Sequence, residues 1–156
     1  MLTIEKKALK TGKLVDTAHV DTVIKNYKKE RWVHNSKRIG KEDSLSVWYS
    51  VEELEDFLQK AKEHGGDGIK IYFGAYGNED APKPLYAGRQ TVVLVATKQK
   101  ETAQGTVNKD IYINTAEGNT ILAYNVGGLC PPFCNNSDDG IGITLVDKGE
   151  DGVIIA

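Results

Sequence analysis

Two cysteines with two prolines among the three residues between them are the residues whose types and spacing most directly suggest chemistry. Cys130 and Cys134 lie in the segment Gly-Gly-Leu-Cys-Pro-Pro-Phe-Cys, residues 127–134. Proline restricts the backbone torsion φ, so the two thiols hold a fixed relation to each other. A redox-active pair usually has two intervening residues at the start of a helix, whereas three intervene here. The segment allows a redox pair, but it also fits a rigid turn with two small buried thiols.

The same cysteines could contribute to a zinc site, because thiolate and imidazole are ligands that zinc prefers. The chain has three histidines, His19, His34 and His64, which stand far apart in the sequence. A structural zinc site usually draws on two close pairs of ligands, and the second pair is missing. No cofactor is predicted, with zinc as the one that the sequence allows. A thiol- or metal-dependent enzyme centred on Cys130 and Cys134, with His34 as their partner, is one allowed function.

Sequence motifs for several other kinds of site are absent. The chain has no Gly-x-Gly-x-x-Gly run for a dinucleotide and no Gly-x-Ser-x-Gly turn for a serine nucleophile. It also lacks a phosphate-binding loop with its lysine and hydroxyl. The acidic stretch 135–140 puts Val146 where a calcium loop needs a bidentate Glu. These absences favour a function other than catalysis.

Tyrosines and an arginine around one long connection predict a contact surface. Residues 77–89 contain two prolines and two acidic residues and are too irregular for a tight hairpin. Aromatic rings beside a guanidinium suit a ligand or a protein partner, although such rings also pack at the rim of a core. The leading hypothesis is therefore a non-enzymatic binding or accessory module that recognises an unknown protein or small molecule through this loop. Its candidate contact residues are Tyr72, Tyr76, Tyr86 and Arg89.

The charge of the chain is unevenly distributed. Residues 1–41 hold eleven Lys and Arg against four Asp and Glu, whereas residues 42–156 hold nine against eighteen. A basic segment could contact nucleic acid, but a solvated helix face that balances an acidic remainder explains it as well, so nucleic acid is not an expected partner. The first residues lack the apolar run of a secretion signal, and the 40% hydrophobic content is ordinary. We therefore expect a cytoplasmic protein without a membrane partner.

Hydrophobic periodicity and capping residues predict the elements that must position these side chains. A first helix is expected from Asp16 or Thr17 to about Trp32, followed by a loop over residues 34–43. Ser50 and Glu53 match a capping box that starts a second helix, which ends at residues 64–66. Strands are expected at residues 45–49, 69–73, 91–97, 110–114, 121–124, 141–146 and 153–155.

This order of elements predicts an α+β fold, with a mainly antiparallel sheet and two principal helices packed on one face. Strands 69–73 and 91–97 are expected to pair antiparallel. The length favours one domain over residues 1–156, with residues 1–15 loosely ordered. An exposed sheet edge or helix face could also pair between two copies, so a structural homo-oligomer is a third allowed function.

Three segments of the chain resemble small uncharacterised proteins of Bacteroidetes-type bacteria. They are Ser-Val-Trp-Tyr-Ser-Val-Glu-Glu-Leu at 46–54, Asp-Gly-Ile-Lys-Ile-Tyr-Phe-Gly-Ala-Tyr at 67–76 and Gly-Arg-Gln-Thr-Val-Val-Leu-Val at 88–95. The similarity spans about residues 14–98, and the segment from Cys130 to Cys134 is similar to one near the end of such proteins. The resemblance implies a bacterial cytoplasmic protein, and it brings no activity and no catalytic residue.

Overall fold

The computed structural model describes residues 10–134, 145–147 and 153–155. It has an α+β fold with mainly antiparallel strands, as the sequence predicts. The helices are α1 (Thr17–Tyr27), η1 (Lys28–Trp32), α2 (Val33–Ile39), α3 (Val51–Glu63) and η2 (Pro84–Tyr86). The strands are β1 (Ser46–Trp48), β2 (Gly68–Ala75), β3 (Gln90–Thr102), β4 (Gly105–Asp110), β5 (Tyr112–Thr115), β6 (Gly118–Ile121), β7 (Ala123–Tyr124), β8 (Gly128–Cys130), β9 (Leu145–Asp147) and β10 (Val153–Ile155).

The elements α1, η1 and α2 form one continuous helix, called the long helix below, with a π-helical turn in its middle. Asp16 caps its start and accepts a hydrogen bond from the backbone nitrogen of His19 at 2.9 Å. The predicted end near Trp32 is wrong, because the helix continues to Ile39, and of the predicted loop over residues 34–43 only residues 40–43 are a loop. The π turn widens the helix without breaking it, and Gly40, with φ 75°, ends it in the left-handed conformation.

Helix α3 forms as the capping box predicts. The Ser50 hydroxyl accepts a hydrogen bond from the Glu53 nitrogen at 3.1 Å, and the Glu53 carboxylate accepts one from the Ser50 nitrogen at 2.7 Å. These bonds, with one from the Tyr124 hydroxyl, hold the pKa of Glu53 below its usual value. Phe57 and Ala61 of α3 are buried in the main core against the sheet. The helix is thus fixed both at its start and along its inner side.

Strand β3 is the centre of the main sheet, which has the order β2-β3-β4, with β7 also paired to β3. Strands β2 and β3 pair antiparallel from Gly68 with Thr97 to Ala75 with Gln90, as predicted. The predicted strand 110–114 is divided at Ile111, whose nitrogen donates to Ala96 and whose carbonyl accepts from Leu122. Among the described residues, β2 pairs with β3 alone. One long side of β2 is therefore a sheet edge.

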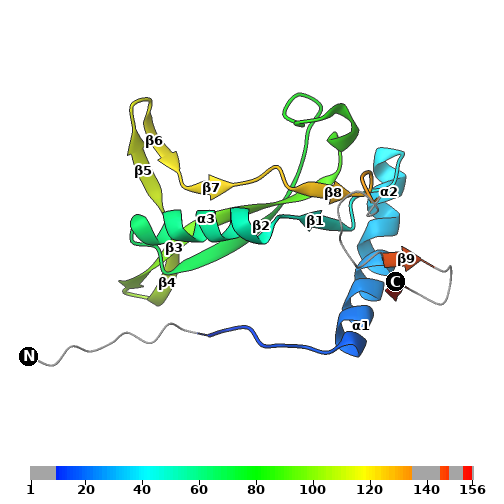
Figure 1. The fold of residues 1–156 in the computed structure, drawn as a ribbon, viewed down its shortest axis with the longest axis horizontal. Helices are drawn as coiled ribbons and strands as arrows, with labels where there is room; N and C mark the ends of the chain where they lie inside the picture. Colours follow the sequence, from blue (N-terminus) through cyan, green and yellow to red (C-terminus); the bar gives the residue numbers. More distant parts are fainter. Residues whose placement is uncertain (1–9, 135–144, 148–152, 156) are drawn as a thin grey trace, which may run out of the picture.

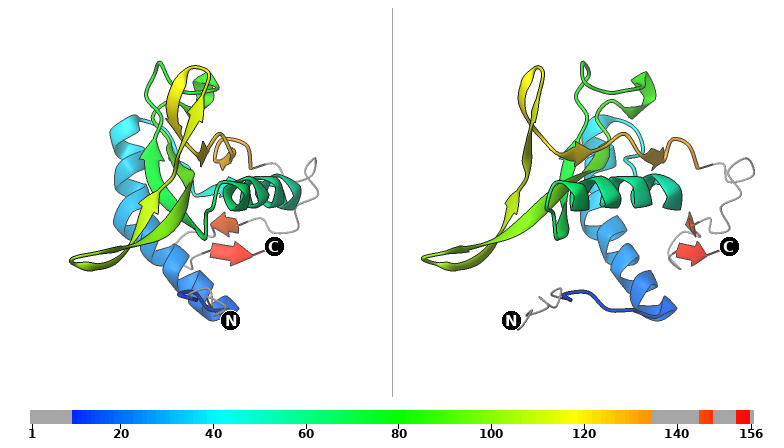
Figure 2. Two further views of the ribbon diagram at one scale, coloured as in Figure 1. Left: turned by 90° about the vertical axis from the view of Figure 1, so that its left-hand side faces the viewer. Right: turned by 60° about the vertical axis from the view of Figure 1, so that its left-hand side comes forward.

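Both principal helices lie on one face of this sheet, as predicted. Tyr27 of the long helix and Leu54 of α3 line the same cavity over Phe73 and Leu94. Figure 1 shows α3 along the strands and the long helix at one end of the sheet, near β1. In both views of Figure 2 the β3–β4 and β5–β6 hairpins extend away from this region.

The described residues near the two ends of the chain add no strand to the main sheet. Residues 10–15, within the segment expected to be loosely ordered, are exposed and have no regular secondary structure, and residues 1–9 lie outside the described part. Strands β9 and β10 pair antiparallel with each other, as predicted, while the rest of the predicted strand 141–146 lies outside the described residues. No helix in the described ranges is both long and apolar enough to cross a membrane.

Candidate functional site

The loop that the sequence assigns to partner contact is packed into the protein. Tyr76, Tyr86 and Arg89 are only 7%, 3% and 6% exposed, so these three residues do not form the expected contact surface. The rings of Tyr76 and Tyr86 stack with centroids 6.0 Å apart, and both contact the fully buried Leu129. The Tyr86 hydroxyl accepts a hydrogen bond from the Leu129 nitrogen at 3.1 Å. They form a second core because the long connection folds back onto β8.

Arg89 has a structural role inside this connection. Its Nε donates to the carbonyl of Glu42 at 2.7 Å, and its Nη1 donates to the carbonyl of Leu85. Within the part of the chain that the structure describes, Arg89 has no ion pair with a carboxylate. A guanidinium that is this deeply buried and bonded to two carbonyls holds the loop in place and does not face a ligand.

Tyr72 lies apart from the other three predicted contact residues, on the opposite face of β2 from Phe73. It is 41% exposed, and its hydroxyl donates to Asp110 at 2.6 Å. Lys70 also contacts the Asp110 carboxylate at 2.8 Å. The hydrogen bonds of this cluster lower the pKa of Asp110 and raise that of Lys70. Tyr72 is accessible, but its hydroxyl already has a partner in the sheet.

Cys130 and Cys134 form a disulfide, which corrects the interpretation of a turn with two free buried thiols. In this state neither sulfur is a thiolate ligand for zinc. His34 is exposed on α2, and no group of three or more His, Cys, Asp or Glu in the described ranges could hold a metal. Instead, Phe133 of the cysteine turn packs on Tyr86 with centroids 5.8 Å apart. The cysteine segment and the tyrosine-containing loop, which the sequence suggests as two separate sites, thus pack against each other.

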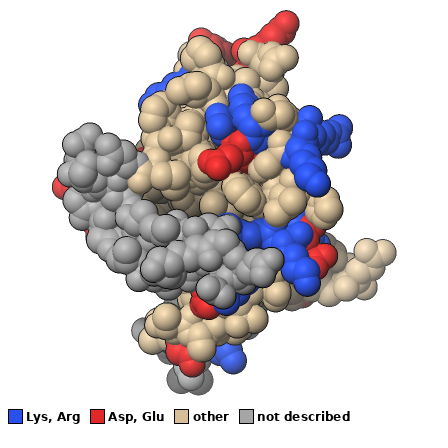
Figure 3. Space-filling model, turned by 90° about the vertical axis from the view of Figure 1, so that its right-hand side faces the viewer, with Lys and Arg blue, Asp and Glu red and all other residues tan. Residues whose placement is uncertain are grey.

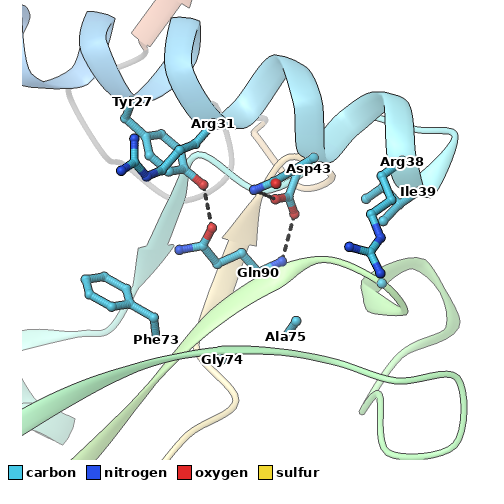
Figure 4. Close-up of a pocket in the computed structure, with 11 residues that line it drawn as sticks. Tyr27, Arg31, Arg38, Ile39, Asp43, Phe73, Gly74, Ala75 and Gln90 are labelled. Carbon is cyan, nitrogen blue, oxygen red and sulfur yellow. Dashed lines mark hydrogen bonds between the residues drawn. The ribbon is translucent and has the colours of Figure 1, made fainter.

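An open cavity lies between the long helix and the sheet, and we call it the helix–sheet groove. It is a cavity of about 770 Å³ with Arg31 and Arg38 on the helix side and Phe73, Gly74 and Ala75 on the strand side. Figure 4 shows the helix above the two strands, with the labelled side chains between them. Ala75 points to the same face as Phe73, and its single methyl group does not reach the helix, so this space stays open.

Hydrogen bonds through Asp43 hold the helix over the strands. The Asp43 carboxylate is buried and accepts from the Gln90 nitrogen at 2.7 Å and from Asn35 at 3.2 Å. Its carbonyl accepts from the Trp32 indole at 2.7 Å, and the Tyr27 hydroxyl donates to the Gln90 side chain (Figure 4). Burial, with the nearby Asp43 carboxylate, raises the pKa of Tyr27. The groove is therefore preformed and does not depend on a ligand for its shape.

The polar end of the groove carries unpaired positive charge. Arg31 and Arg38 are exposed, and in the described part of the chain neither has a hydrogen bond or ion pair. Residues 25–41 contain seven Lys and Arg and one Glu. Figure 3 shows Lys and Arg side chains gathered on the side of the molecule where the long helix lies. A planar guanidinium binds carboxylate and phosphate groups with two parallel hydrogen bonds, so this end suits an anion.

The groove continues into an apolar cavity of about 470 Å³ that shares Tyr27, Phe73 and Gln90 with it. Phe73 is 81% exposed and Ile71 is 56% exposed, although both point to the face that α3 covers further along β2. Tyr49 also lines this cavity, and burial raises its pKa to about 12. An apolar floor beside two free guanidinium groups can hold a molecule that has both an apolar and an anionic part.

The sequence contains a partial signal for this site. Arg31 follows Val20, Ile24 and Tyr27 at the spacing of one helical face, and a cation on this otherwise apolar face indicates a polar cavity beside it. Ile71 and Phe73 alternate with polar residues, which predicts a buried face and conceals their exposure. Comparison of the chain with protein-family models, with curated proteins and with solved structures found no match.

Proposed function

We propose that this protein is a non-enzymatic binding module whose binding site is the helix–sheet groove with its apolar continuation. The observation that carries the proposal is Phe73, which is 81% exposed at the junction of the two cavities. Full burial of a Phe side chain stabilises a protein by about 1.5–3 kcal/mol, and most of that is unused here. A ligand that covers Phe73 would gain it.

The size and lining of the site support this function. Binding pockets for small ligands typically have volumes of about 300–1,000 Å³, and both cavities lie in that range. Such pockets are mostly apolar with a few polar groups that fix the orientation of the ligand. Arg31 and Arg38 supply those groups here. The ligand class that fits is an apolar molecule or segment with one anionic group.

The disulfide supports a different setting from the cytoplasmic one that the sequence predicts. Disulfides persist in oxidising compartments, whereas glutathione and thioredoxin keep most cytoplasmic thiols reduced. Because Cys130 and Cys134 are bonded to each other, we propose that the binding module acts in an oxidising compartment. The bacterial origin implied by the family resemblance is compatible with such a compartment.

The fluorescent probe 1-anilinonaphthalene-8-sulfonate tests the site, because it combines apolar rings with an anionic sulfonate. We expect wild-type protein to enhance its fluorescence. We expect Phe73→Thr to weaken binding by about fivefold to thirtyfold, which corresponds to about 1–2 kcal/mol of lost apolar contact. Tyr112→Thr is the matched control, since Tyr112 is 65% exposed on β5 and lines neither cavity. Equal effects of the two substitutions, or none from Phe73→Thr, would contradict the proposal.

A further inference from the structure

We infer that the occupant of the helix–sheet groove is an extended segment of another protein, which adds as a strand to the edge of β2 and places a carboxylate beside Arg31 and Arg38. This inference rests on the proposed function of the groove and names the class of its ligand. It uses the outward-facing backbone groups along the whole edge of β2, which a small molecule would not cover.

The backbone groups of every second β2 residue point to the open edge. Antiparallel pairs alternate between residues that exchange hydrogen bonds and residues that do not. Tyr76 donates to the Arg89 carbonyl at 3.0 Å, and the register of β2 and β3 continues without interruption from this pair. Lys70, Tyr72 and Gly74 therefore bond to β3. The N–H and C=O groups at positions 69, 71, 73 and 75 are directed outward.

The pairing of β3 with β7 gives the same alternation independently. Ala96 donates to the Leu122 carbonyl at 3.0 Å, so the even-numbered residues of β3 use their backbone groups on the β7 side. The odd-numbered residues of β3 are left to bond to β2, and Val93 and Val95 stand opposite Tyr72 and Lys70. Among the described residues, no strand lies on the outer side of β2. Four outward positions can thus exchange hydrogen bonds with an added strand.

This edge lacks the features that usually prevent strand addition. Natural sheet edges carry proline, charged side chains or bulges, which block pairing with another chain. Strand β2 has no proline, and its pairing with β3 runs over eight residues without a bulge. Its single charged residue, Lys70, is held by Asp110 at 2.8 Å on the face away from the groove. An exposed, unprotected edge with apolar side chains is a template for an extended peptide.

The side chains around the edge define the sequence that the partner needs. Residues two apart in a strand point to the same face, so three alternate residues of an added strand face the groove. Those beside Ile71 and Phe73 meet the apolar cavity, and the one beside Ala75 meets the end with Arg31 and Arg38. The partner therefore carries two apolar residues and one acidic residue at every second position. Either strand direction satisfies this pattern.

Charge favours such a partner over a second copy of this chain. Two copies paired antiparallel through β2 would place two basic long helices on the same face of the joined sheet. Each helix carries Arg31 and Arg38 without an ion pair among the described residues, and β2 has no acidic residue that could neutralise them. Like charges placed together oppose association, whereas a carboxylate on the partner complements the guanidinium groups. The charge of the groove therefore favours an acidic segment of a different protein as the occupant.

Two fluorescein-labelled peptides test the inference by fluorescence anisotropy with the full chain. They are Ser-Val-Ser-Val-Ser-Asp-Ser and its reverse, Ser-Asp-Ser-Val-Ser-Val-Ser, which cover both strand directions. We expect one of them to bind, and we expect Asp→Lys in the peptide to weaken binding at least about tenfold, since a hydrogen bond to a charged group contributes about 1.5–3 kcal/mol. Methylation of the backbone nitrogens of the peptide that face β2 should weaken binding similarly.

Protein variants distinguish a specific contact of the peptide carboxylate with Arg31 and Arg38 from nonspecific electrostatic attraction to the basic helix. The double variant Arg31→Gln, Arg38→Gln should remove the preference for the Asp peptide over the Lys peptide. The double variant Lys29→Gln, Lys37→Gln changes the net charge equally at exposed positions of the long helix that line neither cavity, and it should keep the preference. Loss of the preference in both double variants would mean nonspecific attraction and would overturn the inference.

Three other results would also overturn it. They are no binding of either peptide at millimolar concentration, equal binding of the methylated peptides, and a dimer in light scattering that Phe73→Thr dissociates. The last would identify a second copy as the occupant. The fluorescent-probe titration distinguishes a failure of strand addition from a failure of the proposed binding function. If the probe still depends on Phe73, the groove binds ligands and only strand addition fails. If the probe does not depend on Phe73, the proposed function fails as well.

Discussion

Removal of the Tyr86 hydroxyl should destabilise the protein although only one oxygen atom is lost. Tyr86 is 3% exposed, and its hydroxyl is the acceptor for the backbone N–H of the fully buried Leu129 at 3.1 Å. The substitution Tyr86→Phe keeps the ring and its stacking on Tyr76 but leaves this N–H without its acceptor. A buried unsatisfied donor costs about 1–3 kcal/mol, so the free energy of unfolding should fall by about that amount.

The substitution Phe73→Thr should have a much smaller effect, although it removes a whole ring. Phe73 is 81% exposed, so about one fifth of its surface is buried. One fifth of the about 1.5–3 kcal/mol for full burial gives about 0.3–0.6 kcal/mol. Threonine also retains a high preference for strands, which limits any effect on β2 itself. The two aromatic side chains are thus expected to differ in role, one in stability and the other in binding.

Urea unfolding followed by circular dichroism, with the disulfide intact, measures both effects. The midpoint should shift clearly for Tyr86→Phe and little for Phe73→Thr, with the slope of free energy against urea unchanged in both. Two results together would refute the assignment of Tyr86 to the core and of Phe73 to the binding surface. They are an unchanged free energy of unfolding for Tyr86→Phe and a decrease in that free energy of more than about 2 kcal/mol for Phe73→Thr.

Two further predictions concern charge and the cysteines. The pKa of Glu53 is lowered in the folded state, so its ionised carboxylate stabilises the fold above the usual Glu pKa of about 4.3. This stabilisation is lost as pH falls through the folded-state pKa. The difference in Tm between wild type and Glu53→Gln should therefore narrow from about pH 6 to about pH 3. A difference that widens would contradict this sign. Mass spectrometry after iodoacetamide treatment should show no alkylation without reductant and alkylation of both Cys130 and Cys134 after reduction. The double variant Cys130→Ser, Cys134→Ser should lose about 2 kcal/mol of stability or less, because the disulfide closes a ring with a sequence separation of only 4.

Local patterns predicted the elements well where the signal is complete within a few residues. The capping box of Ser50 and Glu53 needs only neighbouring residues, and the structure confirms it. The pairing of β2 with β3 follows from apolar residues in both strands. The end of the long helix was missed because the residues after Trp32 are polar, and a π turn with Gly40 decides where the helix stops.

The site could not be predicted in the same way, because it depends on contacts between distant parts of the chain. The burial of Tyr86 depends on Leu129, which is 43 residues away in the sequence. The exposure of Phe73 depends on where the long helix crosses the sheet, and that position is set by the bonds of Asp43 to Gln90 and Asn35. None of these pairings leaves a periodic pattern in the sequence. The composition of residues 76–89 therefore predicts contact with a partner for tyrosines and an arginine that in fact pack inside the protein.

The π-helical turn at Lys28–Trp32 makes the groove depend on the length of the long helix. This turn closes with a bond from the Val33 nitrogen to the Lys28 carbonyl, five residues back, so it contains one residue more than an α-helical turn. Each residue of an α-helix advances the side-chain direction by about 100°. Loss of one residue within the turn would leave Tyr27 in place and rotate Asn35 and Arg38 out of the groove by about that angle. A chain that lacks this one residue would keep nearly the same composition and charge, but it would not present Asn35 and Arg38 to the groove.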